Sequence, residues 1–166
     1  IGDFAFEPRY QGAGSSMVNS TKVDSIKDML ESSGISVTGI VHGYQRDGKE
    51  DEAMKKEAVD LARRSDVVLF FFGLNEKSET EGLDRKHLRI PQNQINLIQE
   101  LAKANANMIG IISAGSVIEM QWHHHFKALL HTALMGQAGA GAVLDILSGK
   151  INPSGKLAET YIKKYE

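Results

Sequence analysis

The charged stretch from Leu74 to Ile90 holds the residues whose types and spacing could do chemistry. It reads L-N-E-K-S-E-T-E-G-L-D-R-K-H-L-R-I, with carboxylates at Glu76, Glu79, Glu81 and Asp84 among several basic side chains. Proteins use carboxyl groups as general acids, general bases and nucleophiles. A solvated surface loop whose charges neutralise one another would have the same composition, so the position of the stretch in the fold decides between the two interpretations.

That position is predicted by the segment that comes before it. Residues Asp66 to Gly73 read D-V-V-L-F-F-F-G and form the most apolar run of the chain. A short run rich in β-branched and aromatic residues that ends in glycine indicates a buried central strand. The charged stretch therefore leaves the carboxyl end of a core strand, which is where ligands bind in open α/β sheets. Gly82 would let the backbone turn directly after Glu81.

The rest of the chain alternates between helix and strand patterns. Helices are predicted over 22–32, 49–64, 91–104 and from 142 to 147, and strands over 35–41, 66–73, 108–113 and 127–134. This order predicts one α/β domain over residues 1–166, a three-layer α/β/α sandwich. We expect a mostly parallel sheet of about five to six strands with one antiparallel strand.

Composition excludes several classes of partner. The formal net charge is −2 and the calculated isoelectric point is about 6.3, so neither a nucleic acid nor an anionic membrane is indicated. The chain has no cysteine, which removes disulfides and thiolate chemistry. Its first residues, Ile1 to Ala5, do not resemble a signal peptide, and we expect a cytoplasmic protein.

Four other segments are candidate sites. The loop from Pro8 to Ser16 lacks the Lys-Ser/Thr pair of a phosphate-binding loop. Three adjacent histidines, His123 to His125, point in different directions on either a helix or a strand, so they do not predict a metal site. The run Gly136 to Gly141 favours close packing over dinucleotide binding. Trp122 could be a stacking platform for a sugar or a core residue. We therefore predict no cofactor and no metal.

Taken together and in order, the motifs resemble the second domain of glycoside hydrolase family 3, the β-glucosidase and β-xylosidase type of enzyme. The resemblance begins with P-R-Y-Q-G-A-G-S-S and continues through D-V-V-L-F-F-F-G-L, E-T-E-G-L-D-R and I-P-Q-N-Q. It ends with S-A-G-S-V-I-E-M-Q-W, G-Q-A-G-A-G-A and G-K-I-N-P-S-G-K-L-A-E-T-Y. Each motif alone is weak, but the ordered set covers nearly the whole chain.

The resemblance implies a two-domain retaining β-glycosidase acting on a β-linked glucoside or oligosaccharide. An N-terminal (β/α)₈ barrel would supply an Asp nucleophile, and the sandwich domain would supply the general acid/base. Carried over residue by residue, that group is Glu81, with Glu79 as the competitor for the role. Asp84 and Arg85 would hold the loop together. We expect the barrel and one apolar strand to precede Ile1 in the full-length protein.

This interpretation also predicts how the 166-residue chain behaves alone. Without its barrel the loop from Glu79 to Arg85 should be exposed and mobile, the pKa of Glu81 should be close to its ordinary value, and the chain should be inactive. A non-catalytic carbohydrate-binding or scaffold domain that uses Trp122 is the alternative from another functional class. A nucleotide-binding domain is a third, which the missing phosphate-loop lysine disfavours.

Overall fold

The computed structural model describes residues 1–165 and has a small parallel sheet at its centre. The strands are β1 (Val68–Gly73), β2 (Met108–Ser113) and β3 (Ala128–His131), in the order β1-β2-β3. Both pairs of neighbouring strands are parallel, and Gly73 lies opposite Ser113. The loops after the strands therefore leave from one edge of the sheet, where ligand sites occur in such folds.

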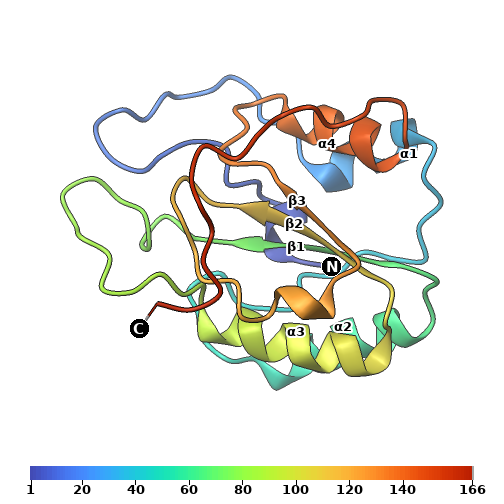
Figure 1. The fold of residues 1–166 in the computed structure, drawn as a ribbon. Helices are drawn as coiled ribbons and strands as arrows, with labels where there is room; N and C mark the ends of the chain where they lie inside the picture. Colours follow the sequence, from blue (N-terminus) through green and yellow to red (C-terminus); the bar gives the residue numbers. More distant parts are fainter. Residues whose placement is uncertain (166) are drawn as a thin grey trace.

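Helices cover the two faces of this sheet. Figure 1 shows α1 (Ile26–Ser33) and α4 (Gly139–Leu147) on one side and α2 (Glu52–Arg63) and α3 (Gln92–Ala104) on the other. The expected α/β/α sandwich is therefore confirmed as three layers. Single turns of 3₁₀ helix, η1 (Asp3–Ala5) and η2 (His123–His125), complete the elements of the described residues.

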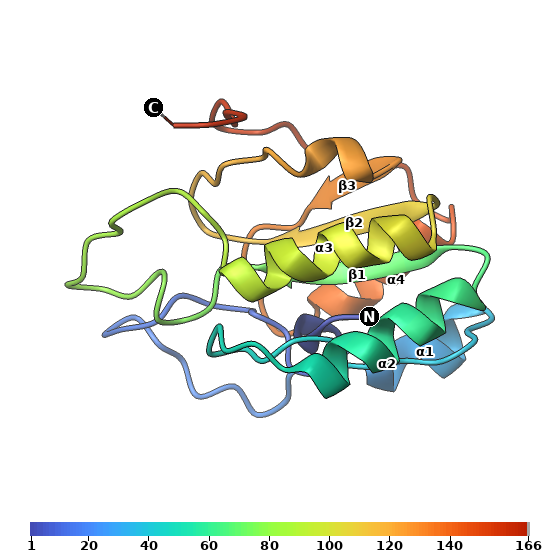
Figure 2. The same cartoon turned by 90° about the horizontal axis from the view of Figure 1, so that it is seen from below.

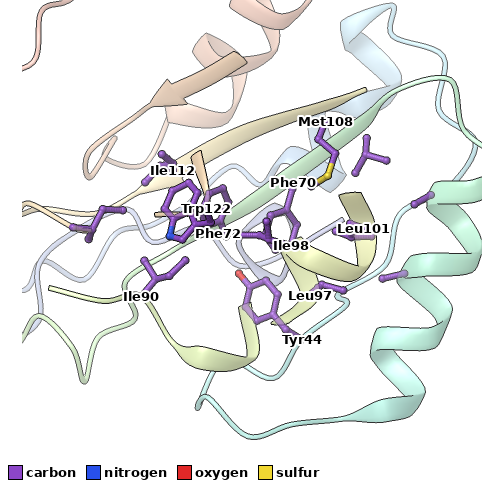
Figure 3. Packing of buried hydrophobic residues seen from close by; sticks show 14 of the residues in the cluster. Tyr44, Phe70, Phe72, Ile90, Leu97, Ile98, Leu101, Met108, Ile112 and Trp122 are labelled. Carbon is purple, nitrogen blue, oxygen red and sulfur yellow. The ribbon is translucent and has the colours of Figure 1, made fainter. Parts of the chain in front are cut away.

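Each face of the sheet has its own apolar core. Phe70 and Phe72 of β1 pack toward α2 and α3, with stacked rings whose centroids lie 4.8 Å apart. Phe71 points to the opposite face, toward α1 and α4. Alternate residues of a strand point to opposite faces, so the apolar run is buried on both sides. Figure 3 shows the larger cluster, in which Trp122 packs beside Phe72.

The expected sheet of five to six strands was wrong for the described residues, which contain three strands and no antiparallel one. Residues 35–41, expected as a strand, form no ladder. The physical reason is the lack of a neighbour, because within residues 1–165 the only other backbone that bonds to this segment is Gly2, whose N–H donates to Val41 O at 3.0 Å. The strand predicted over 127–134 is confirmed as β3, in a shorter form.

Two helix starts also differ from expectation. α1 begins at Ile26 instead of residue 22, and Ser25 caps it, because its Oγ accepts the N–H of Asp28 at 3.1 Å. α4 begins at Gly139 instead of residue 142, because the small residues from Gly139 onward form its first turn. No helix among the described residues has both the length and the apolar character that crossing a membrane requires.

Candidate active site

The charged loop (residues 74–90) lies beside the N-terminal loop (residues 8–16) at the carboxyl ends of the strands. Both loops extend from the same side of the molecule in the two views of Figures 1 and 2. Ala13 and Thr80 form an isolated parallel bridge, and the N–H of Glu81 donates to Ala13 O at 2.9 Å. Two segments almost 70 residues apart in sequence are thus joined by a backbone hydrogen bond at Glu81.

A turn built by Asn75 starts the charged loop. The side chain of Asn75 is buried, and its Oδ1 accepts the N–H of Ser78 at 3.0 Å and the hydroxyl of Ser78 at 2.9 Å. Its Nδ2 donates to Arg46 O at 2.7 Å. Sequence reasoning missed this residue, although an Asn just beyond a buried strand and three residues before a Ser is typical of a side-chain-capped turn.

Glu79 joins the charged loop to the loop after β2. Its Oε2 accepts the N–H of Gly115 at 2.9 Å, and its Oε1 accepts the hydroxyl of Ser116. The side chain is only 12% exposed. Both carboxylate oxygens of Glu79 are therefore occupied by contacts within the fold.

Glu81 is placed differently, on the exposed side of the bridge. Its Oε2 accepts the backbone N–H of Ser15 at 2.6 Å and the hydroxyl of Ser15 as well. The side-chain bond from Ser15, followed by the backbone bond, lowers the pKa of Glu81. The expectation of an ordinary pKa was therefore wrong, because these donors favour the carboxylate over the acid.

A glycine makes this contact sterically feasible. A Cβ added to Gly14 would lie 2.5 Å from the Cβ of Glu81 and 2.6 Å from its Oε2. Gly14 also has φ +133°, a conformation that L-residues with side chains rarely adopt. The Gly-x-Gly-Ser-Ser segment thus leaves room for the Glu81 carboxylate.

The two residues expected to support the loop differ in their surroundings. Arg85 is half-buried, and its Nη1 donates to Ser116 Oγ and to Val117 O, both at 2.8 Å. Asp84 is exposed and has no hydrogen bond or ion pair within residues 1–165. Glu81 is exposed as expected, whereas Glu79 and Arg85 make defined contacts with the loop after β2.

Arg9 is a second residue that sequence reasoning missed. Its side chain is 1% exposed and lies between the two loops. It donates to Gln11 O and to Glu79 O, both at 3.1 Å. A lone arginine in a loop gives no sequence signal for burial, because arginine is mostly exposed unless it is paired.

Beside Arg9, Glu76 belongs to an ion-pair cluster. Arg46 donates from Nη2 to Glu76 Oε1 at 2.6 Å and from Nε to Glu76 Oε2 at 3.1 Å. The same guanidinium donates from Nη1 to Asp3 Oδ2 at 2.7 Å. Glu76 is thereby held in a two-pronged pair and is a poor candidate for proton transfer.

The remaining candidate segments make contacts within the fold. Trp122 is 4% exposed and packs edge-on against Phe72 with ring centroids 4.9 Å apart, so it offers no open face to a sugar (Figure 3). In η2, the Nδ1 atoms of His123 and His124 lie 2.7 and 2.9 Å from the carbonyl oxygens of the residues three positions earlier. Gly139 starts α4, where an added Cβ would lie 2.2 Å from the Cβ of Met135.

Sequence comparison shows which known proteins the chain is similar to. The model of the glycosyl hydrolase family 3 C-terminal domain matches residues 1–166. The chain is 43% identical to an exo-α-(1→6)-L-arabinopyranosidase of Bifidobacterium breve over 162 residues, which are 96% of the chain and 21% of that relative. It is 42% identical to thermostable β-glucosidase B of Acetivibrio thermocellus over 165 residues, 97% of the chain and 22% of that relative.

A solved structure gives the same result for the fold. The crystal structure of a family 3 β-glucosidase of Bifidobacterium adolescentis superposes with a TM-score of 0.90 at 42% identity, over 96% of the chain and 23% of that protein. The chain therefore spans about a fifth of the length of these relatives.

Proposed function

The chain belongs to glycosyl hydrolase family 3, as its C-terminal domain, and from this premise we propose that Glu81 is the general acid/base of a retaining β-glycosidase. The observation that carries the proposal is the contrast in how the carboxylates are bound. Glu79 is engaged through both oxygens within the fold, whereas Glu81 is exposed and bonded through Oε2 alone. A group that must transfer a proton to a substrate needs to be within hydrogen-bond reach of it.

The proposed reaction has two steps and needs a second carboxylate about 5–5.5 Å from the first. An Asp of the proposed barrel domain attacks the anomeric carbon while the Glu81 acid gives its proton to the glycosidic oxygen. The bond between that oxygen and the anomeric carbon breaks, and the alcohol leaves. The Glu81 carboxylate then takes a proton from water, whose oxygen attacks the same carbon and releases the Asp. The configuration at the anomeric carbon is retained.

The pKa of Glu81 has to rise for this chemistry. Its two bonds from Ser15 lower the pKa in the chain alone, and an acid that is ionised has no proton to give. Docking of a barrel domain would bury the carboxyl group and bring the Asp carboxylate near it, and both changes raise a carboxyl pKa. We therefore propose that the isolated chain is inactive and that the acid/base forms only when the domains meet.

Within the described residues, β1 has no other strand on its side away from β2, which supports the proposal that a further strand precedes Ile1. The Ile1 nitrogen donates to Leu69 O and the N–H of Phe71 donates to Ile1 O, both at 2.9 Å, which is the bonding pattern of a parallel pair. A groove of about 400 Å³ continues along this edge, with Ile35, Val67 and Leu69 in its lining.

The experiment uses the full-length enzyme with Glu81→Gln. We expect kcat/KM on 4-nitrophenyl β-glucoside to fall by about 10²–10⁴-fold, the usual contribution of general acid/base catalysis. The same measurement with 4-nitrophenyl α-L-arabinopyranoside distinguishes the sugars named for the two kinds of relative. With Glu81→Ala, added azide should restore turnover and give a glycosyl azide of retained configuration.

Glu57→Gln is the matched control, because Glu57 is an exposed glutamate on α2 outside the two loops. It should leave kcat/KM unchanged. Unchanged activity in Glu81→Gln would remove Glu81 from the mechanism. If Glu79→Ala instead gave the azide product, Glu79 would be the acid/base.

A further inference from the structure

Arg9 is a buried cation with contacts to both loops that present Glu81. Its Nη1 donates to Gln11 O in the N-terminal loop, and its Nη2 donates to Glu79 O in the charged loop. A planar guanidinium with donors in a fixed fork suits a bridge between two acceptors, which a flexible ammonium group does not.

Charge around Arg9 is balanced by the acidic residues of the charged loop. Its Nε lies 3.5 Å from Glu76 Oε1, and its Nη2 lies 3.8 Å from Glu79 Oε2. These separations are ion-pair distances, so the defined hydrogen bonds of Arg9 go to the two backbone carbonyls. Arg9 therefore fixes the positions of the loop backbones as well as neutralising charge.

The bridged carbonyls lie next to the acid/base. Glu79 is two residues before Glu81, and Gln11 is two residues before Ala13, whose carbonyl accepts the N–H of Glu81. Ser15, which holds the Glu81 carboxylate, follows in the same N-terminal loop. A shift of the backbone at Gln11 or at Glu79 would therefore change the contact between Ser15 and Glu81.

We propose that Arg9 is a positioning residue for the acid/base, which sets the place of the Glu81 carboxyl group by joining the two loops through Gln11 O and Glu79 O. This inference rests on the proposed function of Glu81. Arg9 itself contacts no reacting atom in this scheme and acts only through the position of Glu81.

The test is the dependence of activity on the leaving group in the full-length enzyme with Arg9→Met. The kcat/KM for an aryl glycoside reports the step that forms the glycosyl-enzyme. A phenyl glycoside needs its leaving oxygen protonated in that step, whereas a 2,4-dinitrophenyl glycoside does not. We expect kcat/KM to fall about 100-fold for the phenyl glycoside, as for misplacement of a catalytic group by about 1 Å. The value for the dinitrophenyl glycoside should be nearly unchanged.

Arg46→Met is the matched control. Arg46 belongs to the same ion-pair cluster and also pairs with Glu76, but it bonds to neither Gln11 nor Glu79. It should change kcat/KM for the two glycosides by equal factors. An equal loss on both glycosides in Arg9→Met, or no loss on either, would overturn the proposal.

Arg9→Lys covers the case in which Arg9→Met fails to fold. Lysine keeps the buried charge but cannot hold the two carbonyls in the same fork, so the loss should again be selective for the phenyl glycoside, though smaller. A lysine variant with wild-type kcat/KM on both glycosides would overturn the bridging role.

Glu81→Gln, measured on the same two glycosides, separates this inference from the proposed function. If Glu81→Gln shows no selective loss, the acid/base assignment fails. If Glu81→Gln shows the selective loss and the Arg9 variants do not, only the positioning role of Arg9 fails.

Discussion

Glu79 and Glu81 lie two residues apart in one loop, yet the fold treats them in opposite ways. Glu79 is nearly buried and its two oxygens accept bonds from the loop after β2. Glu81 is exposed, and its contacts are with Ser15 of the N-terminal loop. Glu79 stabilises the charged loop, whereas the loop exposes Glu81 to solvent.

The difference follows from where each residue lies relative to the sheet. Glu79 is four residues beyond Asn75, within the anchored start of the loop, and it reaches the adjacent loop because β1 and β2 end at the same level. Glu81 comes after the bridge between Ala13 and Thr80, where the chain turns outward. The bridge thus separates the anchored part of the loop, with Glu79, from the exposed part, with Glu81. It also keeps the exposed Glu81 carboxylate in a defined place.

The largest expected difference between the two carboxylates is in stability. Glu79→Ala should lower the free energy of unfolding of the 166-residue chain by about 1–3 kcal/mol, because the half-buried hydroxyl of Ser116 and the buried guanidinium of Arg9 lose a charged partner. Glu81→Ala should lower the urea midpoint of the chain much less, since Ser15 is exposed and its donors can bond to water. Equal midpoint shifts in the two variants would contradict the division of roles.

Gly14→Ala should give a smaller loss that depends on Glu81. The positive φ and the clash with the Glu81 side chain should together lower the free energy of unfolding by about 1–2 kcal/mol. Gly12→Ala is the control, because the nearest atom to its added Cβ is Ser16 Oγ at 3.9 Å. Urea unfolding of both variants checks the prediction. If the two variants were equally stable, the close contact between Gly14 and Glu81 would contribute nothing to the free energy of unfolding.

The sequence predicted the outline of this site and missed how it is held. The apolar run before Leu74 was enough to predict β1, because burial on both faces demands a continuous apolar pattern. That also gave the location of the charged loop at the edge of the sheet. The size of the sheet was overestimated, because an alternating segment such as 35–41 becomes a strand only where a neighbour can pair with it.

The contacts that distinguish Glu79 from Glu81 could not be predicted from local patterns. Each depends on residues distant in sequence, such as Ser15, which is 66 positions from Glu81, and Ser116, which is 37 positions from Glu79. The burial of Arg9 has the same origin, because its partner Glu79 is 70 positions away. Periodicity describes which face of an element is apolar, and it contains no information on which loops meet.

The smallest effect, and the one that tests the link between the loops most directly, is on the titration of Glu81. Two donors of Ser15 favour the Glu81 carboxylate, so its pKa lies below the ordinary value. This depressed pKa stabilises the folded chain at pH values above the unfolded-state pKa, and that contribution is lost as the pH falls through the folded-state pKa.

Ser15→Ala removes the hydroxyl and keeps the backbone N–H, so the pKa of Glu81 should rise toward its ordinary value. Carbon-13 NMR of the Glu81 carboxyl group measures this, and Ser16→Ala, at an exposed neighbour with no bond to Glu81, should leave the titration in place. If Glu81 titrates at the same pH in both variants, the Ser15 hydroxyl does not hold the carboxylate, and the N-terminal loop would present Glu81 through the backbone alone.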